Sequence, residues 1–131
     1  MKSILTFIAE GIVIDAKSNN VSAFNILEVI SSVGFPVFIQ RIFFFNVLEK
    51  GDNESEEIML LIKNNEEELL RQKATIKFEN NIRHRNIMEI GGLAIPAPGI
   101  LSFEVQHNDK IIGEYSIEIK KIGPPKVEEL K

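Results

Sequence analysis

A short basic segment is the first place in this chain where residue types suggest chemistry. His84 lies between Arg83 and Arg85. Arginine binds a phosphate or carboxylate through two parallel hydrogen bonds. The segment therefore predicts a small anion-binding site at Arg83, His84 and Arg85. The alternative is that these residues are ordinary surface charges facing the acidic loops nearby in sequence, because exposed charges often do no more than interact with solvent.

Catalysis finds little support in the sequence. The second histidine, His107, precedes Asn108 and Asp109 in a predicted turn, where we expect it to be exposed to solvent. A general base needs a partner within hydrogen-bond reach. The nucleophile-elbow, phosphate-loop, dinucleotide and zinc-protease motifs are all missing. We expect a protein that is not an enzyme and uses no cofactor; a hydrolase built on His84 is the least favoured alternative.

Two acidic runs, at 52–54 and 66–68, raise the question of calcium. Calcium requires about six to eight oxygen ligands. Neither run has the spacing of a known calcium loop, so solubilising charge is the preferred interpretation. The chain has no cysteine, which excludes disulfides and thiolate metal sites. We predict no metal site.

Composition limits the partner classes. The chain has 131 residues, 44% of them hydrophobic, and a net charge of −4. An acidic chain is poorly suited to neutralising phosphates, so we expect no nucleic-acid partner. No segment is long and apolar enough for a membrane helix, and Glu10 and Asp15 interrupt the apolar N-terminus before it could form a signal peptide. We expect a soluble cytoplasmic protein that keeps its N-terminus.

Strand patterns dominate the chain. Apolar and polar residues alternate over 101–106 and 115–120, and a turn at 107–110 joins these two segments. This pattern predicts an antiparallel hairpin. Further strands are predicted at 5–15, 35–48, 58–62 and 74–79. We expect one domain over residues 1–122 and a flexible tail over 123–131.

The segment 22–33 has two interpretations. Its apolar residues recur at helical spacing, Ser22 is a suitable N-cap, and Gly34 and Pro36 follow as stop signals. However, Lys17–Asn20 is typical of a hairpin turn between two strands. Spacing alone leaves helix and strand equally supported.

Four sequence motifs resemble a known family of small bacterial proteins that is classified only as a domain of unknown function. They are the segments VSAFNILE (21–28), GFP (34–36), RHR (83–85) and GLAIPAPG (92–99). The resemblance covers roughly residues 6–122 and implies a β-sandwich in which 21–30 is a strand. It implies no activity and no catalytic residues.

Together these observations predict an all-β protein. We expect an antiparallel β-sandwich of immunoglobulin-like type with seven to eight strands. A short helix at 22–33 remains the alternative for that segment.

The predicted strand at 35–48 is apolar on both faces, whereas a sandwich core covers only one of them. The second face must be covered by the tail, by the 22–33 segment or by another chain. We hypothesise that Phe38, Ile42 and Phe44 belong to an interface with a second copy or another protein. The predicted function is a non-enzymatic interaction or self-assembly module; the alternative is a domain that binds a small anionic ligand at Arg83–Arg85.

Overall fold

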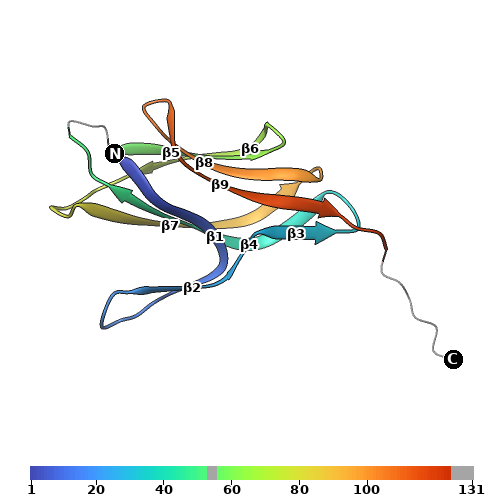
Figure 1. Ribbon diagram of the computed structural model, residues 1–131, viewed down its shortest axis with the longest axis horizontal. Coiled ribbons are helices and arrows are strands. Elements are labelled where there is room, and N and C mark those ends of the chain that lie inside the picture. Colours follow the sequence, from blue (N-terminus) through green and yellow to red (C-terminus); the bar gives the residue numbers. More distant parts are fainter. Residues whose placement is uncertain (53–55, 125–131) are drawn as a thin grey trace.

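The structure is a computed structural model that describes residues 1–52 and 56–124, and these residues form nine strands and no helix (Figure 1). The strands are β1 (Lys2–Ile14), β2 (Val21–Ile26), β3 (Val29–Ser32), β4 (Val37–Glu49), β5 (Glu57–Asn64), β6 (Glu67–Thr75), β7 (Arg83–Ile95), β8 (Gly99–His107) and β9 (Lys110–Lys121). The predicted tail lies outside the described residues from 125 onward, as do residues 53 and 54 of the first acidic run.

The strands form two sheets, which confirms the predicted all-β sandwich. Sheet I has the order β2-β1-β4-β7, and sheet II has the order β3-β9-β8-β5-β6. The chain crosses between sheets after β2, β3, β4, β6 and β7, whereas β1–β2, β5–β6 and β8–β9 are hairpins. This places β1, β4 and β7 where an immunoglobulin-like sandwich has strands A, B and E, and β5, β8 and β9 where it has C, F and G.

The core lies between the two sheets. Each central strand contributes alternate apolar side chains, as a half-buried strand should. Phe44 from β4 and Phe103 from β8 are fully buried, and they are among the largest side chains there. The predicted 101–119 hairpin supplies Leu101, Val105 and Ile117 to the same core.

The helix considered for residues 22–33 is wrong, and so is the count of seven to eight strands. The segment forms two strands that belong to different sheets: β2 pairs with β1, and β3 runs parallel to β9. The chain changes sheets at Leu27–Glu28, so the two alternating patterns are out of phase. Because of this change of phase, the apolar residues of the segment recur at the spacing expected for one face of a helix. The segment forms two strands rather than one, which brings the number of strands to nine.

Strands β4 and β7 change the phase of their inward side chains at the same point. Val37 and Ile39 pack against the core, but beyond Arg41 the inward residues are Ile42 and Phe44. On β7, Gly92 lies near this position and adopts a positive φ of 68°, a conformation that glycine accepts without steric cost. The alternation therefore shifts by one residue in the middle of both strands.

Strand β1 leaves sheet I halfway along its length. It pairs with β4 from Lys2 to Ala9, and beyond Ala9 it pairs only with β2. The β1–β2 hairpin folds beneath the outer face of sheet I (Figure 1), and its tip reaches the start of β7, where Arg85 Nη2 donates to the carbonyl of Asn19 at 2.8 Å. Phe24 lies over Gly11, where a Cβ would have no room.

The outer face of sheet I is aromatic. Phe7 and Phe45 stack with ring centroids 4.8 Å apart, and Arg41 lies over the Phe43 ring at 5.4 Å. Phe45 is buried on this face, opposite in direction to the core residue Phe44. The prediction that residues 35–48 are apolar on both faces is thus confirmed.

Candidate functional site

The predicted interface residues do not share one surface. Ile42 is 1% exposed and Phe44 is 0% exposed, and both lie in the core. Their assignment to an interface is wrong, because the phase shift near Arg41 turns them inward. Phe38 lies before the shift, points outward and is 66% exposed. It remains a candidate for an interaction surface.

The three predicted anion-binding residues are brought together. Arg83, His84 and Arg85 line an open cavity of about 560 Å³ with Lys77, which the sequence did not single out. We call these four residues the basic pocket. Neighbouring residues of β7 point to opposite faces, and the cavity lies at the start of this strand. Residues of the 76–82 connection, together with Asn19 and Val47, complete its lining.

The charges of the basic pocket are only partly free. Arg83 Nε lies 3.6 Å from a Glu49 carboxylate oxygen. The Arg85 guanidinium is held by a backbone carbonyl, which orients it but neutralises no charge. His84 makes an edge contact with the Phe78 ring, with the ring centroids 6.3 Å apart. The pocket has the donors to hold an anion, against partial competition from Glu49 and from Glu79, which also lines the cavity.

His107 is not the exposed turn residue that we predicted. It is the last residue of β8 and is only 6% exposed. It continues the inward series of Leu101, Phe103 and Val105, so the strand pattern extends further than the turn prediction allowed.

A second concave site runs along the edge of β4. Six consecutive residues, Val37–Ile42, line a cavity of about 410 Å³, and Glu10, Leu27 and Ile30 form its opposite wall. We call this the β4 groove. Neighbouring residues of a strand point to opposite faces. A cavity lined by six in a row therefore follows the strand's edge rather than either of its faces.

This edge is open because β1 departs. Pairing between β1 and β4 ends at Ala9–Phe43, and over Val37–Ile42 the structure pairs β4 with β7 alone among the described residues. Backbone donors and acceptors on the β1 side of this stretch lack a strand partner within the same described part of the chain. Such an edge is a template for another extended chain.

The side chains of the β4 groove are mainly apolar. Leu27, Ile30, Val37 and Ile39 each pack partly against the core and present their remaining surface to the groove. Glu10 is the acidic group of the groove, and its Oε2 accepts a bond from Asn25 at 3.1 Å.

Most of the exposed apolar side chains lie in the first part of the sequence, which also contains the residues of the β4 groove. Among the described residues, nine of the thirteen large exposed hydrophobic side chains precede residue 40. They are Ile4, Leu5, Val13, Ile14, Phe24, Ile26, Val29, Val33 and Phe38. This unevenness marks β1–β4 as the part of the chain most suited to binding another protein.

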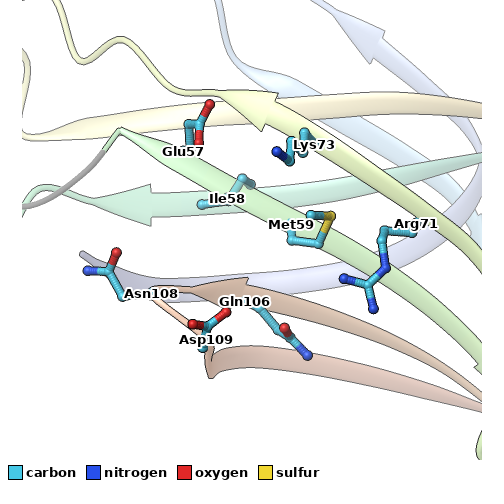
Figure 2. Close-up of a pocket in the computed structure, with 8 residues that line it drawn as sticks. All are labelled: Glu57, Ile58, Met59, Arg71, Lys73, Gln106, Asn108 and Asp109. Carbon is cyan, nitrogen blue, oxygen red and sulfur yellow. The ribbon is translucent and has the colours of Figure 1, made fainter.

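The outer face of sheet II has a different character. A depression of about 280 Å³ lies there between β5, β6 and the β8–β9 turn. Figure 2 shows the residues that line it. Its charged lining carries both signs, with Arg71 and Lys73 on β6 and with Glu57 and Asp109 on the other elements. Mixed charges of this kind are typical of a solvated face.

Ion pairs reinforce this character of sheet II. A hydrogen bond to Glu68 raises the pKa of Arg71. Lys63 Nζ lies 3.1 Å from a Glu104 carboxylate oxygen, and this bond raises the pKa of the lysine. These charges are partnered within the chain, so they offer little to a ligand.

Sequence reasoning missed the β4 groove. Its opposite wall comes from Glu10, Leu27 and Ile30, and only the departure of β1 brings them beside β4. Gly11, where Phe24 occupies the space of a Cβ, is the one signal in the sequence that β1 is irregular at this point.

Two further observations concern metal sites and membrane-spanning helices. Within residues 1–52 and 56–124, no group of three or more histidine or acidic side chains is arranged to hold a metal ion. In the same residues there is no helix of the length and apolarity needed to cross a bilayer.

The fold defines this chain as an immunoglobulin-like β-sandwich, and comparisons with known proteins add little to that. No protein-family model matches it, and no curated protein matches it. Among solved structures it is similar to Pseudomonas fluorescens alkylpurine DNA glycosylase AlkC bound to DNA containing an abasic site analog. The identity is 13% and the TM-score 0.41, over 88% of this chain and 30% of the glycosylase chain. At those values the likeness carries no information about function.

Proposed function

We propose that this protein is a non-enzymatic interaction module that binds an extended segment of a partner protein in the β4 groove. The segment adds to sheet I as a strand, antiparallel to β4, in the position that β1 vacates beyond Ala9. Apolar residues at alternate positions of the partner contact Leu27 and Ile30, and a residue between them contacts Phe38 on the outer face. Cytoplasmic localisation and membership of the small bacterial family remain parts of this proposal, as does the absence of a nucleic-acid partner.

One observation carries the proposal: six consecutive residues of β4 line a cavity along an edge that has no strand partner among the described residues. Strand addition obtains affinity from main-chain hydrogen bonds and specificity from pockets for alternate side chains. The groove supplies both, because its backbone edge is open and its opposite wall is mainly apolar. Glu10 and Arg41 place one charge of each sign along the groove.

The test is selection of binding peptides from a random library displayed on phage, followed by hydrogen exchange of the complex. We expect the selected peptides to alternate apolar and polar residues. We expect them to protect the amides of Val37–Ile42 and to lose affinity about tenfold or more when Phe38→Ser removes the most exposed aromatic ring of the groove.

The matched control is Ile111→Ser. Ile111 is 54% exposed and lies on β9 of the other sheet, outside the groove lining, so its loss should leave peptide affinity unchanged. Failure to select any peptide, or protection at residues other than Val37–Ile42, would reject the proposal.

A second candidate function is supported by the basic pocket, where Lys77 joins the three predicted residues around one cavity. Under this alternative the module binds a small anion. Titration with inorganic phosphate and with citrate should then raise the melting temperature in a salt-sensitive manner. The double variant Lys77→Gln/Arg83→Gln should abolish the rise. A melting temperature that both anions leave unchanged excludes the alternative.

A further inference from the structure

Strand β7 is a long edge strand whose outer side is unoccupied. It spans Arg83–Ile95 at the end of sheet I and pairs only with β4. No backbone hydrogen bond joins its other edge to any part of the described chain. In an antiparallel ladder alternate residues direct their N–H and C=O groups to each side, so this edge presents an unfilled row of donors and acceptors.

The edge strand of sheet II, β6, carries charges more densely than β7 does. Natural sheets guard their edges with charged side chains or proline. Strand β6 carries Glu67, Glu68, Arg71 and Lys73 within nine residues. Strand β7 carries three charges, Arg83, Arg85 and Glu89, over thirteen residues, and it contains no proline. A long edge strand with few charges of both signs is suited to pairing with another strand of complementary charge.

We propose that β7 pairs antiparallel with β7 of a second copy of this chain, about a two-fold axis at Ile87. In this register Ile87 lies opposite Ile87 of the second copy, and Arg85 lies opposite Glu89. Because the axis repeats every contact, two Arg85–Glu89 pairs form. The two copies of sheet I then become one continuous sheet.

Charge complementarity selects this occupant and this register. Arg85, Ile87 and Glu89 share one face of β7, since they are two residues apart. Opposite charges directly across a strand pair stabilise it, and like charges destabilise it. A shift of the axis to Met88 would place Glu89 opposite Ile87 and leave Arg85 without an acidic partner.

A shift of the axis in the other direction, to Asn86, pairs the charges less well. Arg85 would then lie opposite an apolar residue, and Glu89 would lie opposite Arg83. Arg83 already has a carboxylate oxygen of Glu49 at 3.6 Å, so it gains less from a second acidic partner. In that register Arg85→Glu would not weaken the dimer, which makes this variant a test of the register.

The two charges are available for the proposed contact. Arg85 forms no ion pair with any described carboxylate, and its bond to the Asn19 carbonyl holds the guanidinium in place without neutralising it. Glu89 lies 3.8 Å from Arg41, with side chains 57% and 61% exposed. An exposed pair at that distance contributes little and competes weakly.

This inference goes beyond the β4 groove, because β7 lies on the side of β4 opposite to the groove. Peptide binding and dimer formation can therefore fail independently. A monomeric protein that still binds peptides would reject only the dimer, and a dimer that selects no peptides would reject only the groove.

The first experiment is light scattering on a sizing column over a range of protein concentrations. We expect wild type to be a dimer. Arg85→Glu and Glu89→Arg each place like charges opposite one another, and each should raise the dimer dissociation constant about tenfold or more. The double variant Arg85→Glu/Glu89→Arg restores opposite charges in the exchanged order and should dimerise as wild type does.

The matched control is Arg41→Gln, which removes the partner of Glu89 within its own chain and should leave the dimer intact. A wild-type protein that is monomeric at all concentrations overturns the proposal. So does a double variant that dimerises no better than the single variants, because that result would mean the two charges do not meet.

A second measurement does not depend on charge. The chain has no cysteine, so Ile87→Cys introduces a single thiol at the axis. Directly opposed residues in a strand pair lie within the span of a disulfide. Mild oxidation should cross-link this variant into a covalent dimer, whereas Thr75→Cys on the guarded edge of β6 should remain uncross-linked. Equal cross-linking of both variants would contradict the β7 pairing.

Discussion

At the scale of single residues, asparagine side chains hold the connections of the sandwich. Asn64 is 2% exposed; its Nδ2 donates to the carbonyls of Ala97 and Ile100, and its Oδ1 accepts from the Ala97 N–H at 2.9 Å. Asn65 binds Pro98 and Ile100 in a similar way. The β5–β6 turn thus fastens the proline-rich connection between β7 and β8.

Removal of one such side chain should be costly. Asn64→Ala leaves buried donors and acceptors of the connection without partners, and each such group costs about 1–3 kcal/mol. We expect the free energy of unfolding to fall by about 2–3 kcal/mol in urea denaturation. Asn20→Ala, at an exposed turn position, is the control and should change it by less than about 0.5 kcal/mol. Equal effects of the two substitutions would contradict this role for Asn64.

Two residue assignments show what sequence patterns can and cannot provide. The inward position of His107 follows from the alternation that places Phe103 and Val105 in the core, and this alternation outweighs the turn propensity of the residues that follow His107. The separation of Phe38 from the core residues of β4 was not accessible in this way. It depends on a phase shift that β4 shares with β7. The position of Gly92 in the sequence does not reveal that this glycine adopts a positive φ where the shift occurs.

At the scale of elements, one tyrosine hydroxyl group links the β2–β3 connection to sheet II. Tyr115 on β9 donates to the carbonyl of Leu27 at 2.5 Å, at the point where the chain passes from β2 to β3. Tyr115→Phe removes this bond and takes the donor away from that carbonyl. We expect a loss of about 1 kcal/mol in the free energy of unfolding, measured by urea denaturation at neutral pH.

The same contact should make the free energy of unfolding depend on pH in the alkaline range. Burial raises the pKa of Tyr115 above its usual value of 10.0, and the negative charge of Glu28 adds to the rise. Below that pH the phenol is neutral in both states. As the pH rises beyond it, the unfolded chain loses the proton first, so the free energy of unfolding falls. Lys63 should also lower the free energy of unfolding as the pH rises, because its pKa in the folded protein is raised as well.

Comparison of wild type with Tyr115→Phe isolates the tyrosine. Urea denaturation between pH 8 and pH 11 should show a steeper decline for wild type than for the variant, so the two curves converge at high pH. Parallel curves across this range would mean that Tyr115 has the same pKa in the folded and unfolded chain.

The elements themselves were largely predictable, because most strands carry a period of two and end at strong turn residues. The 101–119 hairpin and the strands at 5–15 and 35–48 follow from local pattern alone. The 22–33 segment could not be settled in this way. Its two strands take their hydrogen bonds from β1 and β9, and local spacing contains no record of those partners.

At the scale of the whole molecule, the two outer faces of the sandwich differ in kind. Sheet II presents paired charges such as Glu68 and Arg71, whereas sheet I presents aromatic side chains with the β1–β2 hairpin beneath them. A protein that only had to remain dissolved would gain from charges on both faces. The asymmetry favours sheet I, with the β4 groove and the β7 edge, as the side of the molecule that binds other chains.

The hairpin should also be the least stable part of this arrangement. Beyond Ala9 its strands pair only with each other, whereas β4 and β8 lie between two neighbouring strands. Segments with few buried apolar contacts open at lower free energy than the core. In native-state hydrogen exchange, the amides of Ile12–Ile14 and Val21–Ala23 should therefore exchange faster than those of Phe103–Val105.

A single substitution at the bend separates opening of the hairpin from unfolding of the sandwich. Phe24→Ser uncovers Gly11, because the ring occupies the space directly over that glycine. We expect faster exchange in the hairpin and unchanged exchange in β8, since the core between the sheets does not include Phe24. Equal protection of hairpin and β8 in wild type would instead mean that the hairpin opens only when the whole sandwich unfolds.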